Sequence, residues 1–515
     1  MLNKAELRIL RPTNHLPMLS ILAVAITLLL VSVSVYADEL SDLKAMVKAL
    51  NDRIDAMEAK QKAESEQRAA DAKNAEAARK AEAEQAAVMG TAEEGGREVL
   101  PGPLRKDQQG KLVDQTSNPV MLYSGRNTTL RLYGLIEPTL QNANHQNAAG
   151  DNVTGYQVSW FSGNRLGFDA MHLLSSKDDS MLNGVIVMAK LETEYELPTG
   201  NMDTANVFFN RDAWAGFYSD NLGKLTFGRQ NTLTRDFTQN WGDAYGTPDV
   251  TLKEGGYSNV NNFKQFIFYS AAPTGTRLNS GIVWKKDWDG HWLTGLAYAF
   301  GSGGNGGSGD VGTGGSVPGD FTKGTSFAAS VAYNHLQVGP GEFNLNGSYD
   351  RGNNSDLIHQ SELFGGNYNA GWWRINGGYA HYTAQQGLNN VAGTRTDNSW
   401  TVSGSLFPFG PKTEFALGYI HFHGDHAGFN GGGITINPYG NTSGVTTTAD
   451  GGKNSTYGSI MYHWDNQLDL YVAADYFTVT GGWVIHDALG NGGTFGTGHP
   501  YNNVTELAVG FRFRF

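Results

Sequence analysis

The C-terminal segment 506–515 alternates between apolar and polar positions. Successive side chains of a strand point to opposite faces. Leu507, Val509, Phe511, Phe513 and Phe515 therefore share one face, and Glu506, Ala508, Gly510, Arg512 and Arg514 share the other. Three phenylalanines on one face, ending at the last residue, suit the lipid face and aromatic girdle of an outer-membrane barrel better than a soluble sandwich.

Short alternating runs of the same kind recur from residue 129 onward. Segments 185–196 and 468–476 each place valine, leucine, alanine or tyrosine on one face. Their opposite faces carry Lys190, Glu192, Glu194, Glu196, Asp469 and Asp475. Such charges would be costly in a dry core, whereas they are common on a face that lines water. The pattern predicts an all-β transmembrane barrel over 129–515.

The links between these predicted strands alternate in length. The short turns are 219–223, 271–275, 369–371, 409–411 and 465–467, and the long links are 141–162, 231–261, 301–324, 384–398, 424–454 and 484–502. Outer-membrane barrels have short periplasmic turns and long external loops. The alternation therefore assigns the long links to the outside.

The strand number follows from this alternation. Both ends of the barrel are expected on the periplasmic side, which requires an even number. Reading each apolar alternation as one strand gives 17. Asp289-Gly290 resembles a two-residue hairpin turn, but a turn there would invert every later long loop, so we read 277–300 as one long or bulged strand. The prediction is a 16-stranded antiparallel barrel, with 18 strands as the alternative.

The N-terminal segment 1–37 has a different composition. Three basic residues precede an apolar run from Leu19 to Val35, and Val35-Tyr36-Ala37 places small residues before Asp38. This arrangement is typical of a secretory signal peptide. An uncleaved membrane anchor is the alternative, because the apolar run is nearly long enough to span a bilayer.

Residues 38–89 are predicted to form a helix. Leu40, Leu43, Val47, Leu50, Ile54 and Met57 follow a 3-4-3-4-3 spacing. This spacing is the seam of a short α-helical coiled coil, although so short a seam would hardly hold chains together alone. A solitary charged helix that acts as a spacer is the alternative. Glycines and prolines make 90–128 a linker.

Composition excludes several classes of protein. The chain of 515 residues has no cysteine, which removes disulfides, thiolate metal sites and cysteine nucleophiles. No apolar run after residue 36 reaches the length of a spanning helix. A net charge of −12 argues against nucleic-acid binding. No motif for catalysis, a metal or a cofactor emerges, so we expect no enzyme and no cofactor.

Several motifs in 129–270 and the last strand resemble one family, the general bacterial porins, which are trimeric outer-membrane proteins of Gram-negative bacteria. The motifs are Leu132-Tyr133-Gly134, Asn164-Arg165-Leu166-Gly167-Phe168, Asn210-Arg211-Asp212-Ala213-Trp214-Ala215-Gly216, Leu222 to Gln230 and Gly510 to Phe515. The resemblance implies a homotrimer in the cell outer membrane, in contact with lipid. It also implies a water-filled channel for passive diffusion of small hydrophilic solutes and ions.

The resemblance further implies a third external loop that folds inward as a constriction. Here that loop would be 231–261, with the acidic residues Asp236, Asp243, Asp249 and Glu254. The wall residues that match the family's motifs are Arg165, Arg211 and Arg229. Opposed charges at close quarters orient polar solutes and sort ions, so these seven residues are the candidate site.

The chain departs from the family's pattern in its N-terminal helix, which resembles the periplasmic coiled-coil extensions of some substrate-selective trimeric porins. Leu135 and Glu137 stand where the family often has a wall lysine, and Lys253 lies beside the loop acids. A porin selective for sugars or organic anions is therefore one alternative. A barrel that tethers the outer membrane to the cell wall through residues 38–89 is another.

Overall fold

The computed structural model describes residues 48, 120–145, 149–157, 160–161, 163–175, 182–238, 277–300, 325–354, 357–386, 394–429, 447–465, 467–486 and 501–515. The chain divides into two units, Met1–Gly96 and Arg97–Phe515. All that follows concerns the second unit. The predicted signal peptide lies outside the described residues, as does the predicted coiled coil apart from Lys48.

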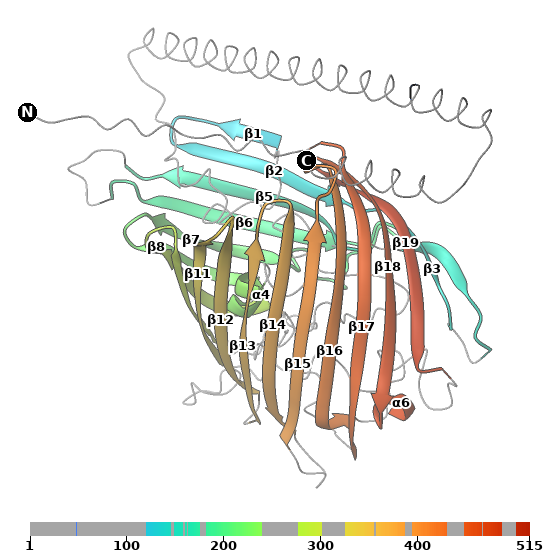
Figure 1. Cartoon of the computed structure of the whole chain (residues 1–515). Helices are drawn as coiled ribbons and strands as arrows, with labels where there is room; N and C mark the ends of the chain where they lie inside the picture. Colours follow the sequence, from blue (N-terminus) through green and yellow to red (C-terminus); the bar gives the residue numbers. More distant parts are fainter. Residues whose placement is uncertain are drawn as a thin grey trace, which may run out of the picture. The chain divides into compact units, whose positions relative to one another are not determined.

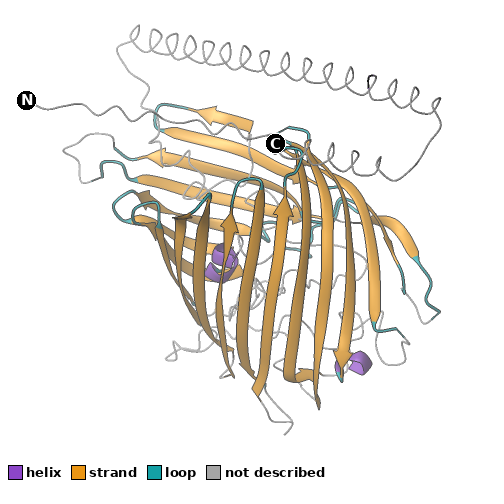
Figure 2. Cartoon of the chain, viewed as in Figure 1, coloured by secondary structure: helices purple, strands orange, loops and turns teal. Residues whose placement is uncertain are grey.

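The second unit is built from one antiparallel sheet (Figures 1 and 2). Its strands are β1 (Val120–Ser124), β2 (Thr128–Ile136), β3 (Thr139–Ala143), β4 (Val153–Gln157), β5 (Asn164–Leu173), β6 (Ile186–Tyr195), β7 (Asp212–Ser219), β8 (Gly223–Asn231), β9 (Arg277–Asp287), β10 (Trp292–Ala299), β11 (Ser326–Val338), β12 (Gly341–Asn354), β13 (Leu357–Asn369), β14 (Trp373–Gln385), β15 (Thr394–Leu406), β16 (Thr413–Phe429), β17 (Thr447–His463), β18 (Leu468–Gly481) and β19 (Asn503–Arg514).

These strands close into a barrel of sixteen, as predicted. β2 and β3 form one barrel strand and β4 and β5 the next, because β2 pairs with β5 while β3 pairs with β4. β1 pairs with β2 alone and lies outside this count. The last strand, β19, pairs with β18 on one side and with β2 and β3 on the other. The described sheet therefore closes on itself through β19.

Side chains alternate between an exposed apolar outer face and a polar inner face. On β19, Phe511 and Phe513 are 41% and 37% exposed, whereas Arg512 and Arg514 are 1% and 5% exposed. The exposed face continues around the sheet through residues such as Leu296, Phe364 and Ile460. This division matches a barrel with lipid outside and water inside.

The prediction that 277–300 is a single strand is wrong. β9 and β10 pair with each other from Gly281↔Ala299 to Asp287↔Leu293, and the hairpin turn lies at Asp289-Gly290. The Asp287 carboxylate accepts the backbone N–H groups of Asp289 and Gly290, at 3.1 and 2.6 Å, and Gly290 has φ 82°. Short-range side-chain bonds of this kind stabilise tight turns.

The hairpin adds one strand to the predicted count. The count nevertheless remains even, because β8 pairs directly with β9 and leaves no place for a further strand between them. The turn predicted at 271–275 lies outside the described residues, so it does not enter the count. Turns after β7, β9, β11, β13, β15 and β17 are all short, and longer links follow β8, β10, β14, β16 and β18, but only residues 355–356 lie between β12 and β13. From β7 onward, the predicted alternation of short and long connections therefore holds except between β12 and β13.

β1 lies within the segment predicted to be a linker. It pairs with β2 from Val120↔Leu132 to Ser124↔Thr129. Phe515, just beyond β19, exchanges backbone hydrogen bonds with Gly134. β1 therefore continues the line of β19 along the same edge of β2.

Within the described part of the chain, two short helices pack on the inner face. α4 (Leu233–Thr238) follows β8 and lies within the barrel in Figure 1. Its Leu233 and Phe237 join a buried cluster with Val283, Ala297 and Ala328 of the wall. α6 (Trp483–His486) follows β18, and Trp483 packs beside Phe422 and Phe477. No helix among the described residues is both long and apolar enough to cross a membrane.

Candidate functional site

The inner face of β6 carries alternating charges that form ion pairs with the neighbouring strands. Lys190 Nζ lies 3.2 Å from Glu192 and 3.3 Å from Asp212 of β7. Glu192 also accepts a hydrogen bond from the Tyr133 hydroxyl at 2.7 Å. Because these side chains are buried, each carboxylate offsets the desolvation cost of the cation beside it.

Arg211, a predicted wall residue, belongs to this network. Its Nε donates to Glu192 at 2.5 Å, and its Nη1 is paired with Glu194. Arg165, the second predicted wall residue, is buried on β5, where its Nε donates to the Gly163 carbonyl at 3.2 Å. Both guanidinium groups attract Glu192, so the structure brings these two predicted residues to the same carboxylate.

Arg229, the third predicted wall residue, lies on β8. It occupies an irregularity in the pairing of β8 with β9, between Gly228 and Gln230. Its Nε donates to the Asn210 carbonyl at 2.7 Å, and its Nη1 is hydrogen-bonded to Asn279. The bulge interrupts the strand alternation, which is why sequence spacing alone does not assign this side chain to a face.

Two arginines that the sequence analysis did not select lie beside Arg211. Arg277, the first residue of β9, donates from Nε to the Arg211 carbonyl at 2.9 Å. Arg211 and Arg235 of α4 both lie close enough to Arg277 to repel it. Three guanidinium groups, from β9, from α4 and from the residue just before β7, therefore gather on this part of the wall.

Of the four predicted loop acids, the structure describes Asp236 alone. Asp236 lies on α4, paired with Lys285 of β9, and it accepts a hydrogen bond from Asn231 at 2.7 Å. Burial raises the pKa of Asp236, but the Lys285 ammonium and the hydrogen bonds outweigh it, so the pKa lies below its ordinary value. Asp243, Asp249 and Glu254 lie outside the described residues.

The loop acids were predicted to face the wall arginines, but Asp236 forms its ion pair with a lysine. Its cationic partner is Lys285, which sequence motifs did not select. Alternation in β9 was the available signal, because Val283 and Lys285 share the face on which α4 packs. The Lys-x-Glu-x-Glu alternation of β6 correctly predicted that Lys190 and Glu192 lie on the inner face. It did not predict the residues with which they form ion pairs.

A separate network lies where the barrel closes. Arg514 of β19 is paired with Asp469 of β18. Arg512 Nε lies 3.3 Å from Glu137, whose carboxylate also accepts the backbone N–H groups of Trp160 and Phe161 at 2.8 and 2.6 Å. The Arg512 contact joins the first and last barrel strands and the Arg514 contact joins the last two, so both arginines belong to the seam where the barrel closes.

The closed barrel, its exposed apolar outer face and its charged inner wall define an outer-membrane channel protein. The model of the Gram-negative porin family matches residues 117–482, and the chain belongs to that family. It is a protein of the cell outer membrane. Porin family and fold together indicate a channel for small solutes.

Several solved structures are similar to this chain. The anion-selective porin from Comamonas acidovorans is 19% identical, with 75% of this chain and 100% of that chain covered and a TM-score of 0.53. OmpT of Vibrio cholerae is 15% identical, with 77% and 99% covered and a TM-score of 0.47. OmpF of Salmonella typhi, in complex with daunomycin, is 14% identical, with 77% and 100% covered and a TM-score of 0.47. The comparison with curated proteins finds no match.

Proposed function

We propose that the protein is a porin through which small hydrophilic solutes and ions diffuse passively, with the segment between β8 and β9 as an inward constriction. The lumen supplies water, and the constriction selects by size and charge. Solutes bind weakly enough to leave, because tight binding would stop the flux. No catalytic step or cofactor enters this mechanism.

The observation that carries this proposal is the docking of α4 on the inner wall. α4 begins only two residues after β8, yet it contacts β10, β11, β12 and β13. The Asn346 amide of β12 donates to the Phe237 carbonyl at 2.6 Å, and Lys285 is paired with Asp236. A segment held on the inner face in this way occupies part of the cross-section of the lumen.

Liposome swelling tests the proposal. Liposomes that contain the purified protein are diluted into neutral sugars of increasing size. We expect fast swelling with the smallest sugars and a steep fall as the sugar grows, because the constriction sets the size limit. Swelling no faster than that of protein-free liposomes, for every sugar, would contradict a diffusion channel.

A preference for anions, organic anions included, is a second candidate, supported by the cluster of Arg211, Arg235 and Arg277. Nearby guanidinium groups raise the local concentration of anions and repel cations. The test is the reversal potential in a salt gradient, whose sign reports which ion crosses faster. A cation-selective potential would contradict this candidate.

We also propose a homotrimer in which residues 38–89 form a periplasmic coiled coil after removal of a signal peptide at 1–37. The heptad spacing of the sequence supports the coiled coil, which could also contact the cell wall. Deletion of 38–89 separates the roles. Unchanged conductance with weaker cell-wall association would favour a tether, whereas altered selectivity would favour a part in solute uptake.

A further inference from the structure

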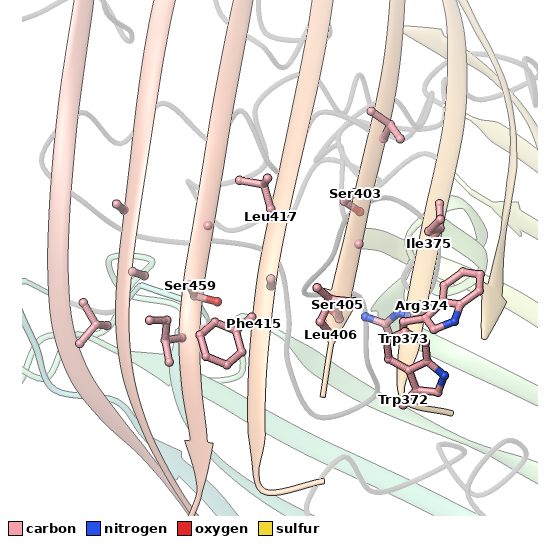
Figure 3. Close-up of a pocket in the computed structure, with 18 residues that line it drawn as sticks. Trp372, Trp373, Arg374, Ile375, Ser403, Ser405, Leu406, Phe415, Leu417 and Ser459 are labelled. Carbon is pink, nitrogen blue, oxygen red and sulfur yellow. The ribbon is translucent and has the colours of Figure 1, made fainter. Parts of the chain in front are cut away.

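An apolar groove crosses the outer face of the barrel over β14 to β18. Its volume is about 930 Å³, and its lining residues come from the same third of each strand, next to the short turns (Figure 3). Small residues create the depression. One row of outward-facing residues crosses five neighbouring strands in register and consists of Ile375, Gly404, Leu417, Gly458 and Ala474.

At two of these glycines a side chain would press against the backbone of the neighbouring strand. A Cβ at Gly458 would lie 3.0 Å from the Ala416 carbonyl oxygen and 3.5 Å from the Leu417 side chain. A Cβ at Gly404 would lie 3.0 Å from the Arg374 carbonyl oxygen. The neighbouring row, which includes Leu406 and Ile460, carries large side chains. The groove is therefore bounded by residues that project outward and floored by backbone.

The periplasmic end of the groove has the features of a headgroup region. Trp372 and Trp373 lie at this end (Figure 3), and Trp372 is 62% exposed. Indole rings favour the interface between hydrocarbon and water, where their N–H groups meet polar partners. Exposed Lys412 lies in the adjoining turn, three residues before Phe415 of the groove, and donates to the Trp464 carbonyl at 3.3 Å. A cation at this level complements a lipid phosphate.

We infer that this groove holds an acyl chain of a phospholipid of the periplasmic leaflet, with the phosphate near Lys412 and the tryptophans. The inference rests on three observations: the groove is apolar, it opens on the membrane-facing side, and it ends at the short-turn side of the barrel. Its volume lies within the range of roughly 300–1,000 Å³ that is usual for sites of small apolar ligands. It does not depend on what crosses the pore.

Filling the groove tests the inference. Wild-type protein and the Gly458→Leu variant are reconstituted in vesicles of phosphatidylethanolamine and phosphatidylglycerol and then extracted in mild detergent. Native mass spectrometry measures how much phospholipid stays bound to each protein. We expect wild type to retain phospholipid. Because packing alone distinguishes the groove from bulk lipid, we expect roughly a fivefold lower occupancy in Gly458→Leu, or about 1 kcal/mol.

Gly347→Leu is the matched control. Gly347 lies on the outward side of β12, and a Cβ there would meet nothing closer than 3.6 Å. This variant adds the same side chain to the outer face away from the groove, so it should retain phospholipid like wild type. Unchanged single-channel conductance of Gly458→Leu would show that its barrel is intact. If the conductance of Gly458→Leu is altered, the same experiment is carried out with Gly404→Leu.

Three results would overturn the inference. Equal phospholipid occupancy in wild type and both groove variants would show that lipid binds elsewhere. Displacement of phospholipid by lipopolysaccharide added to the vesicles would assign the groove to the other leaflet. Loss of the oligomer in Gly458→Leu, with no phospholipid on wild type, would show that a second copy of the chain covers the groove.

Discussion

Two parts of the inner wall are packed by different means. On the inner face of β6 and just before β7, the buried charged residues Lys190, Glu192 and Arg211 neutralise one another. Under α6 an apolar cluster forms, with Phe422 and Phe477 around Trp483, and the buried cations Arg395 and Lys453 lie over the Trp483 ring. The same strand alternation thus supports both kinds of inner face. The role proposed for the charged part is to select ions, whereas the apolar part packs against α6, which follows β18.

The apolar part is expected to be the more sensitive to truncation. Phe422 is fully buried in the cluster under α6. Phe422→Ala should lower the free energy of unfolding by about 3–5 kcal/mol, because it removes a buried ring and leaves a cavity. Urea unfolding in lipid vesicles measures this loss. Phe422→Leu, which keeps most of the volume, should cost clearly less, and equal losses would argue against tight packing here.

Breaking the charged network should cost somewhat less. Glu192→Gln leaves Lys190 and Arg211 with one carboxylate fewer in a buried site. We expect a loss of about 3 kcal/mol in the free energy of unfolding, which is typical when one partner of a buried pair is removed. The control is Glu196→Gln, just beyond the end of β6. If both variants unfold alike, Glu192 does not hold the wall together.

Neutral replacement of a cation should separate the charged wall from the seam. Arg277→Gln removes one of three clustered guanidinium groups, so the permeability of cations relative to anions should rise by roughly twofold, as expected for one charge at several ångströms in water. Arg512→Gln removes a cation of the seam and should leave the reversal potential unchanged. A shift of equal size in both variants would contradict the distinction.

The anchoring of α4 should depend on pH. The pKa of Asp236 is lowered in the folded state, so its ion pair stabilises the docked helix above the ordinary pKa of about 3.9 and is lost as the pH falls through the lowered value. Current noise in planar bilayers should therefore rise only in this acidic range. Lys285→Gln should move the rise to higher pH. In Asp236→Asn the acid-induced rise should disappear, and its persistence would rule out this carboxylate.

The sequence predicted which face of a strand a side chain occupies better than it predicted which residues contact one another. Alternation alone identified the inward side of Lys190 and the outward side of Phe511 and Phe513, because a strand has a fixed period of two. Pairing between distant strands has no such local signal, so neither Lys285 beside Asp236 nor β1 beside β2 was predicted. The hairpin at Asp289-Gly290 was visible locally, but a parity argument that relied on a turn at 271–275 overruled it.

The most direct test of the constriction is a thiol placed on α4. The chain has no cysteine, so Asp236→Cys gives a single reactive site on α4. A bulky charged thiol reagent should lower the single-channel conductance of this variant in planar bilayers, because the label narrows the lumen. Phe364→Cys, on the exposed outer face, should conduct as before after labelling. Labelled Asp236→Cys with an unchanged conductance, or wild-type protein that forms no channels at all, would contradict the account.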